Sequence, residues 1–279
     1  MKGGRWLFLA VGTVVTFILF LVLTLCLVPD REVQGLATRL LEREGYSLRA
    51  TRFGKAFPLG IKAVDLEISG EKGPLLSAGT ASVRLRLLPL LTGRLSFTCE
   101  ARIGTGRISG DYSLRNGEAR MEASRILLED IPFFRTVTDT QARGELRLNG
   151  RFIAKGKEAG GELRLEVKGA HVGGVKIGGI PLPDADYSLV QGMLRARGGV
   201  VRLESFTLQG EGLYVRLKGD FPFTTPPDNA PLNLPLELMP KAEFLEKQKF
   251  VFLLLSKYLI SPGNYRIPIR GTLAKPMLQ

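Results

Sequence analysis

The chain is poor in the residues on which most catalytic and metal sites depend. Its 279 residues include one histidine, two cysteines and one tryptophan. A lone His171 speaks against a histidine-based metal site, since zinc sites need three or four protein ligands. It predicts an exposed or hydrogen-bonded residue at a strand end. Cys26 falls inside a predicted membrane span and Cys99 outside it, so the two cysteines cannot form a disulfide.

Motifs of enzyme active sites are also lacking. No nucleophile, base and metal ligands stand together in a recognisable arrangement. Gly173-Gly174 and Gly178-Gly179 are not followed by the Lys-Ser or Lys-Thr of a phosphate-binding loop. The adjacent acids Glu129-Asp130 are explained by helix capping from Asp130. We therefore predict no catalytic residue, no metal ligand and no cofactor, and expect a protein that is not an enzyme.

Charge is completely missing from residues 6–28, which form one apolar run. A transmembrane helix needs roughly 20 such residues. Because Lys2 and Arg5 precede the run, the positive-inside rule places residues 1–5 in the cytoplasm and the rest of the chain outside. A cleaved signal peptide is the alternative, but its apolar core is roughly 7–15 residues long and ends at a small-x-small site. Leu25-Cys26-Leu27-Val28-Pro29 offers no such site, so the run predicts an uncleaved single-pass anchor.

The rest of the chain is basic, and the formal net charge is +12. In a cytoplasmic protein this charge would suggest nucleic acid. Here it is spread along predicted strands that face away from the cytoplasm, so we expect no nucleic-acid partner. Two interpretations stay open: a solvated sheet face on which Arg and Lys alternate with Glu, or attraction to an anionic membrane surface or an acidic partner.

Residues 29–45 predict a juxtamembrane amphipathic helix. Asp30 can cap it and Gly45 can end it. An apolar stripe follows helical spacing at Val33, Leu36, Ala37, Leu40 and Leu41.

From residue 46 to 279 the pattern has a period of two and predicts a periplasmic β-rich domain. Asn116-Gly117 is a type I′ hairpin signal between two alternating runs. The apolar phase changes after Ala63 and again after Leu203, which predicts β-bulges that bend the sheet. We expect a mainly β fold: a large antiparallel, twisted and groove-like sheet with one wet and one dry face and a few short helices.

Three segments interrupt the alternation. A subdivision falls near residues 129–142, where Asp130-Ile131-Pro132-Phe133-Phe134 predicts a capped helical turn or a loop that plugs something apolar. Residues 222–240 are proline-rich and predict an extended connection along an edge. Residues 241–259 predict a helix packed over one end of the sheet. In the last strand, Pro268 favours an edge position.

The dry face supplies the candidate binding site, an apolar groove that could hold acyl chains. The alternative is that the same side chains form the core of a closed sandwich. The candidate residues are Leu95, Phe97, Leu163, Leu165, Val167, Leu213, Val215 and Leu217.

The whole pattern resembles the type II secretion system protein N family, most closely its delta-proteobacterial branch, and is more loosely similar to AsmA-like proteins. Short segments spread over nearly the whole chain carry the resemblance: Phe57-Pro58-Leu59-Gly60-Ile61 with Val64-Asp65-Leu66, Val83-Arg84-Leu85 before Leu90-Leu91-Thr92-Gly93, Gly104 to Gly110, and Ile269-Arg270-Gly271-Thr272-Leu273-Ala274-Lys275-Pro276.

The resemblance implies a non-enzymatic accessory or assembly component of the type II secretion system. It would be a single-pass protein of the cell inner membrane with the bulk of its chain in the periplasm, where it contacts other secretion components. The alternative that the resemblance leaves open is an AsmA-like periplasmic protein that binds or transfers phospholipid. The chain is much shorter than the large AsmA-like lipid bridges, which argues against a conduit between two membranes.

Overall fold

The structure is a computed structural model that describes residues 30–43, 45–57, 59–154, 159–177, 180–224, 230–272 and 275–278. The predicted tail (1–5) and anchor (6–28) lie outside these residues. Within them, no helix is long and apolar enough to cross a bilayer.

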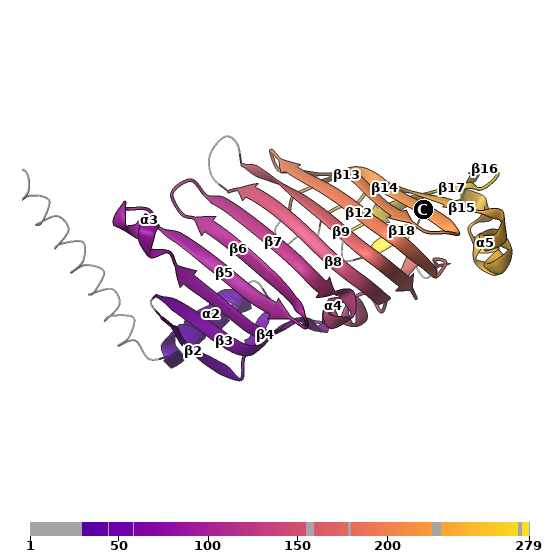
Figure 1. Cartoon of the computed structure of the whole chain (residues 1–279). Coiled ribbons are helices and arrows are strands. Elements are labelled where there is room, and N and C mark those ends of the chain that lie inside the picture. The colour runs from indigo at the N-terminus through magenta and orange to yellow at the C-terminus, as the bar shows by residue number, and fades with distance from the viewer. Residues whose placement is uncertain are drawn as a thin grey trace, which may run out of the picture.

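One antiparallel sheet of 16 strands dominates the molecule (Figure 1). The prediction of a mainly β fold with a few short helices is confirmed. Neighbours in sequence are neighbours in the sheet along the path β1-β3-β4-β5-β6-β7-β8-β9-β12-β13-β14-β15-β17-β16. Two further strands join at the ends, because β2 pairs with β3 and β18 pairs with β17. A separate hairpin is formed by β10 and β11.

The strands are β1 (Ser47–Arg49), β2 (Arg52–Ala56), β3 (Gly60–Gly70), β4 (Gly73–Leu85), β5 (Ser96–Ile103), β6 (Gly106–Ser113), β7 (Glu118–Leu127), β8 (Gln141–Ile153), β9 (Gly160–Gly173), β10 (Lys176–Ile177), β11 (Ile180–Pro181), β12 (Ala185–Arg197), β13 (Val200–Gln209), β14 (Leu213–Pro222), β15 (Leu234–Pro240), β16 (Leu259–Ser261), β17 (Asn264–Gly271) and β18 (Pro276–Leu278). The helices are α2 (Asp30–Arg43), α3 (Leu87–Leu91), α4 (Pro132–Thr136), α5 (Ala242–Lys247) and α6 (Lys249–Leu254), with 3-10 turns η1 (Leu128–Asp130) and η3 (Ser256–Tyr258).

The short helices lie at the two ends and along one side of the sheet (Figure 1). Helix α2 occupies most of the predicted juxtamembrane segment and packs beside β1 and β2. Helix α4 contacts β4 and β8. Helices α5 and α6 lie at the end of the sheet opposite α2 (Figure 1). The sheet runs without interruption through residues 129–142, because β7 pairs directly with β8.

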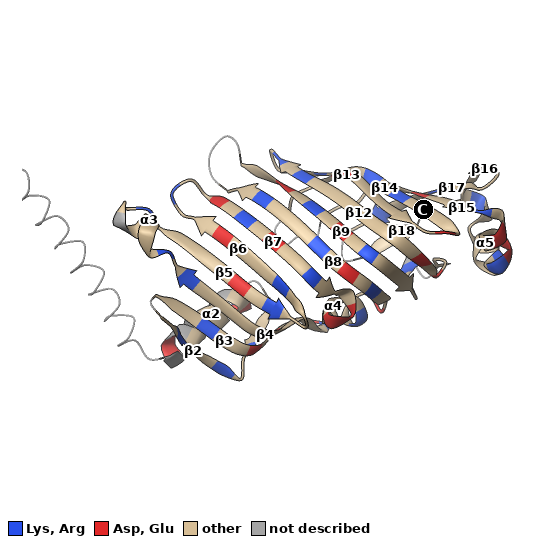
Figure 2. Ribbon diagram, viewed as in Figure 1, with Lys and Arg blue, Asp and Glu red and all other residues tan. Residues whose placement is uncertain are grey.

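Lys, Arg, Asp and Glu recur at intervals along the strands (Figure 2). Opposed residues in an antiparallel pair point to the same face, and one such row runs Thr98, Asp111, Arg120, Arg151, Glu162 and Arg195. Arg120 and Arg151 both donate to Glu118 at 2.9 Å, and Arg202 makes a two-bond contact with Asp220. Because these pairs are exposed to water, each contributes little to stability, but together they keep the face wet.

The basic partners hold the pKa of the Glu118 and Asp220 carboxyls below their usual range. Hydrogen bonds from Arg120 and Arg202 are the main causes. A carboxyl with a lowered folded-state pKa stabilises the fold above its unfolded pKa, and this stabilisation is lost as the pH falls through the folded value. The ion pairs of this face, which we call the ion-pair ladder, therefore stabilise the fold at neutral pH, and this stabilisation decreases in acid.

The buried core lies on the opposite face and is concentrated toward the C-terminal strands. Leu213, Leu238, Leu255 and Ile267 are each at most 2% exposed. Phe252 of α6 packs on Tyr265 of β17, with ring centroids 5.1 Å apart. A smaller cluster joins Ala78, Ile103, Ala123 and Ile126 near α4.

The proline-rich segment is not an edge connection, and that prediction is wrong for residues 234–240. They form β15, which pairs with β14 on one side and β17 on the other. Pro235 lies opposite Pro268, so two residues without an N–H share one position of the ladder. The register of β15 with β14 stops at Leu236 and that of β17 with β18 stops at Ile269, so neither proline stands in a second ladder on its other side, where an N–H would be needed. Strand β17 is likewise internal, with β16 and β18 on its outer side.

The predicted helix cap at Asp130 is also wrong. The residue before α4 is Ile131, and no side chain caps this helix. Asp130 ends the η1 turn instead. The plug itself is present, because Leu128 is buried and Ile131 and Phe134 pack against the core.

Local irregularities agree with the sequence in part. The β6–β7 hairpin forms at Asn116-Gly117, but only Gly117 has a positive φ, so the turn is not type I′. A register shift between Leu203 and Phe206 matches the second phase change. At the first, Asp65 adopts a φ of 51° while the register with β4 stays constant on both sides, so the strand pair kinks together without a one-sided bulge.

The predicted helix 241–259 is broken into α5, α6 and η3, and Leu259 already belongs to β16. Gln248 separates the two helices with φ −110° and ψ 26°, which is not helical. The break lets α6 turn Phe252 and Leu255 toward the core.

Core burial predicts a contrast between two positions on the apolar side of the sheet. Ile267→Ala should lower the free energy of unfolding by about 2–5 kcal/mol, because a fully buried side chain leaves a cavity. Val83→Ala, at a position 43% exposed on the same side of the sheet, should cost less than about 1 kcal/mol. Urea unfolding followed by circular dichroism measures both values. Equal losses would contradict the difference in cover between these two positions.

Candidate functional site: an apolar face covered at one end

The candidate site is the apolar face of the sheet. The register between strands shows which side chains share this face. Phe97 lies opposite Leu85 on one side and Tyr112 on the other, and the row of opposed residues continues across the sheet to Phe152 and Phe221. A second row contains Val83, Cys99, Met121, Leu163 and Leu203. Further rows contain Leu165, Phe206, Leu217 and Ile267, and then Val167, Val190, Val215 and Leu238.

Cover over this face is uneven. Val167, Val190, Val215 and Leu238 are at most 6% exposed. In the row that begins at Phe97, the aromatic side chains of Phe97, Tyr112, Phe152 and Phe221 are only half-buried. Burial therefore falls off from one end of the strands to the other.

The covered part is closed by curling of the sheet and by α6. The β10–β11 hairpin, which connects β9 to β12, contacts β18 although five strands separate β9 from β18 in sheet order. The sheet must therefore wrap around its apolar face at the C-terminal end. Phe252 of α6 and Leu255, the C-cap residue of this helix, belong to the core inside this curl.

The uncovered part ends in a line of exposed apolar residues at the strand ends. Val83, Leu95, Leu114 and Phe223 are 43%, 38%, 40% and 63% exposed. Leu95 and Leu114 are neighbours, because the N–H of Leu114 donates to the carbonyl of Leu95 at 2.9 Å. We call the surface that begins at this rim the open region. It includes the exposed Cys99 and the half-buried side chains of Phe97, Tyr112, Met121, Phe152 and Leu163.

The predicted groove residues divide between the two parts. Val167, Leu213 and Val215 are buried in the closed core. Leu165 and Leu217 are half-buried against it. Leu95, Phe97 and Leu163 lie in the open region or on its rim. Alternation identified the right face, but it could not distinguish the covered part from the uncovered part.

Sequence reasoning did not include Cys99, Tyr112, Met121 and Phe152 in the groove. Each alternates in phase with its neighbours, so the periodicity signal was present. What was missing was the register between strands, which places these four residues beside Phe97 and Leu163.

Cys99 is the one residue of the open region with a reactive group. Partial burial, and secondarily the negative charge of Asp111, raises the pKa of its thiol. A raised pKa keeps the thiol protonated at neutral pH and poorly nucleophilic. Its environment is therefore that of an apolar surface residue rather than of a catalytic cysteine.

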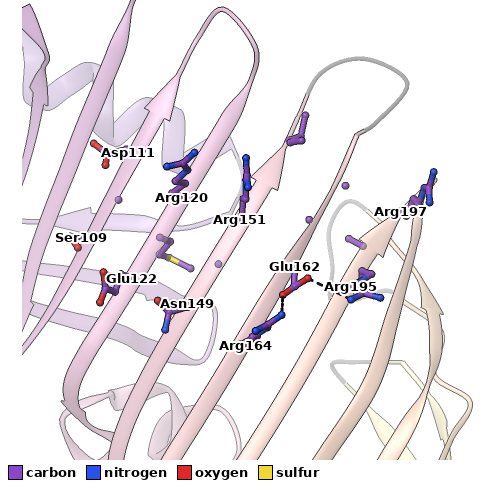
Figure 3. A pocket seen from close by; sticks show the side chains of 17 residues that line it. Ser109, Asp111, Arg120, Glu122, Asn149, Arg151, Glu162, Arg164, Arg195 and Arg197 are labelled. Carbon is purple, nitrogen blue, oxygen red and sulfur yellow. Dashed lines mark ion pairs between the residues drawn. The ribbon is translucent and has the colours of Figure 1, made fainter. Parts of the chain in front are cut away.

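The wet face carries a concavity of about 920 Å³, lined by alternating acids and bases (Figure 3). Arg164 and Arg195 both contact Glu162, at 2.6 Å and 3.5 Å. Arg195 also reaches Glu204 at 2.5 Å. These arginines already have carboxylate partners, so the concavity is part of the ion-pair ladder.

The single histidine is hydrogen-bonded across the sheet. His171 Nδ1 lies 2.7 Å from Asp186 Oδ1 in the neighbouring strand, which makes it the hydrogen-bonded strand residue expected from the sequence. Among the residues that the structure describes, no group of three or more His, Cys, Asp or Glu side chains could hold an ion.

The same polar substitution should destabilise the protein more in the closed core than in the open region. Val215→Gln should lower the free energy of unfolding by about 3–5 kcal/mol, because it buries an amide without partners and loses apolar contacts. Leu163→Gln, where water reaches the side chain, should cost less than about 2 kcal/mol. Thermal and urea unfolding check both variants. A Leu163 variant as unstable as the Val215 variant would show that the whole face is a closed core.

Comparison with known proteins adds no relative: no protein-family model, no curated protein and no solved structure matches this chain.

Proposed function

We propose that the chain is a non-enzymatic accessory or assembly component of the type II secretion system. Residues 6–28 would anchor it in the inner membrane, with residues 46–279 in the periplasm. The proposal is supported by the resemblance of segments such as Phe57–Ile61 and Gly104–Gly110 to the protein N family. In this chain those segments lie at or beside the hairpin turns of a single sheet. A single uninterrupted sheet suits a protein that works by presenting surfaces.

Contacts with other secretion components would use the faces of this sheet more than its edges. The strands at the ends of the sheet are short: β1, β16 and β18 have three residues each and β2 has five. Short edge strands limit pairing with another chain. The wet face is broad and carries the arginines of Figure 3. Because acids and bases alternate on this face, a partner surface that carries both signs of charge would complement it.

Deletion of the gene in its own host should abolish secretion and leave folded cargo in the periplasm. The full chain should restore secretion. A matched chain in which a cleavable signal peptide replaces residues 1–29 should restore it poorly, because it would not stay at the membrane. Immunoblots of culture medium and periplasm measure the outcome. Normal secretion by the deletion strain would refute the secretion role.

A second candidate function, lipid binding, is favoured by one observation. The open region and its rim leave large apolar side chains in contact with water, including Leu95, Leu114 and Phe223. Contiguous exposed apolar surface in a soluble domain usually marks a binding site. Acyl chains match it, because they need no hydrogen-bond partners and can lie along adjacent rows. Helix α2 follows directly after the proposed anchor and packs beside β1 and β2, so a bilayer would lie near the N-terminal end of the sheet.

Lipid bound in the open region should be found by mass spectrometry of purified residues 30–279 expressed in the periplasm. We expect about one phospholipid per chain, reduced by Leu163→Gln while the far-UV circular dichroism stays unchanged. A chain free of lipid would favour the closed-core alternative and leave the secretion role standing.

A fluorescent label on Cys99 gives an independent test for lipid in the open region, because Cys99 is the only cysteine in residues 30–279. A polarity-sensitive fluorophore on Cys99 should shift to shorter wavelength when phospholipid is added. The matched control carries Cys99→Ser and Thr98→Cys, which moves the label by one residue to the wet face. Equal shifts at both positions would show non-specific lipid adsorption.

A further inference from the structure

Helix α6 is apolar on both sides. Phe252 and Leu255, at its inner side, are 4% and 0% exposed. Phe250 and Leu253, at its outer side, are 71% and 67% exposed. A helix that is apolar all round is normally buried on all sides, in a protein core or in a membrane. None of the described residues covers the outer side of α6.

The outer apolar surface continues beyond the helix. Leu254 closes α6, and Leu259 and Ile260 lie in β16, the strand at the end of the sheet path. They are 43%, 47% and 56% exposed. We call Phe250, Leu253, Leu254, Leu259 and Ile260 the distal tip. Its elements lie at the end of the molecule opposite α2 (Figure 1).

Lysines flank the distal tip. Lys247 and Lys249 stand on either side of the break between α5 and α6, and Lys257 follows in η3. All three are exposed. Lys257 Nζ lies 4.7 Å from the ring centroid of Tyr258. Exposed Phe and Leu beside Lys is the composition of a segment that lies in a membrane interface.

We propose that the distal tip inserts into the interface of an anionic lipid bilayer. Phe250 and Leu253 would enter the acyl region, while Lys249 and Lys257 would reach the headgroup phosphates. A helix of six residues is far too short to span the membrane, so insertion is shallow. The surface differs from the open region, and this inference stands or falls independently of the proposed function.

Charge favours a bilayer over a second copy of the chain as the occupant. Two tips packed together would bring their lysines close to one another, and like charges at an interface oppose association. An anionic membrane surface attracts the same lysines. The two acidic residues of α5, Glu243 and Glu246, do not balance Lys241, Lys247, Lys249 and Lys257.

The tip is distant from the N-terminal end of the domain. The path from β1 to β16 takes 13 strand-to-strand steps. At about 4.8 Å a step this is roughly 60 Å along the sheet. The bilayer that receives the tip can therefore be the host membrane or a second one, and the experiment needs an arm for each.

A tryptophan placed at the tip tests the proposal in the full chain. The chain has one tryptophan, so Trp6→Phe with Phe250→Trp leaves a single reporter. This variant is reconstituted in vesicles of phosphatidylcholine and phosphatidylglycerol. Brominated lipid, which quenches tryptophan on contact, is placed in the host vesicles in one arm and in added vesicles in the other. We expect quenching in at least one arm. Its absence from both would overturn the proposal.

Charge variants supply the control. Lys249→Glu with Lys257→Glu should raise the concentration of anionic lipid needed for quenching by at least about tenfold. Arg197→Glu with Lys218→Glu makes the same change in net charge away from the tip and should have little effect. Equal weakening by both pairs would show attraction by net charge alone. A tryptophan shift that grows with protein concentration without lipid would show a second copy as the occupant, and would also overturn the proposal.

Discussion

Period-two sorting of side chains is the constraint on which the rest of this structure depends. In an antiparallel sheet every second residue faces the same way, and this chain keeps one phase apolar and the other charged from β4 to β14. An apolar face of that size must be covered, by curling, by helices or by something outside the chain. Each notable feature of the molecule follows from how that requirement is met along the sheet.

At the C-terminal end the requirement is met within the chain. The sheet curls until the β10–β11 hairpin contacts β18, and α6 contributes Phe252 and Leu255 to the interior. Near α4 a short plug of Leu128, Ile131 and Phe134 does the same on a smaller scale. At the other ends of these strands, away from α4, no described helix buries the row of Phe97, Tyr112 and Phe152, and this is the open region.

The sequence predicted most of the fold because the information in it is local. Alternation identified the strands and the sides of the sheet, and the phase change after Leu203 identified a real register shift. The same reasoning failed at residues 234–240, where prolines suggested an edge. There the structure places Pro235 opposite Pro268, a solution that depends on two segments more than 30 residues apart. A pattern within one short segment cannot predict a pairing between segments so far apart in the chain.

The sequence predicted which face of the sheet is apolar, but it did not predict which part of that face is left uncovered. Leu163 and Val215 have similar surroundings in the sequence, each an apolar residue followed by an arginine in an alternating run, yet Leu163 is half-buried and Val215 is 6% exposed. Their difference comes from what lies above them, and cover is set by tertiary packing of α6 and by curvature. A run of alternating residues therefore predicts where apolar surface will gather, whereas only the arrangement of covering elements decides whether that surface becomes core or remains available to a ligand.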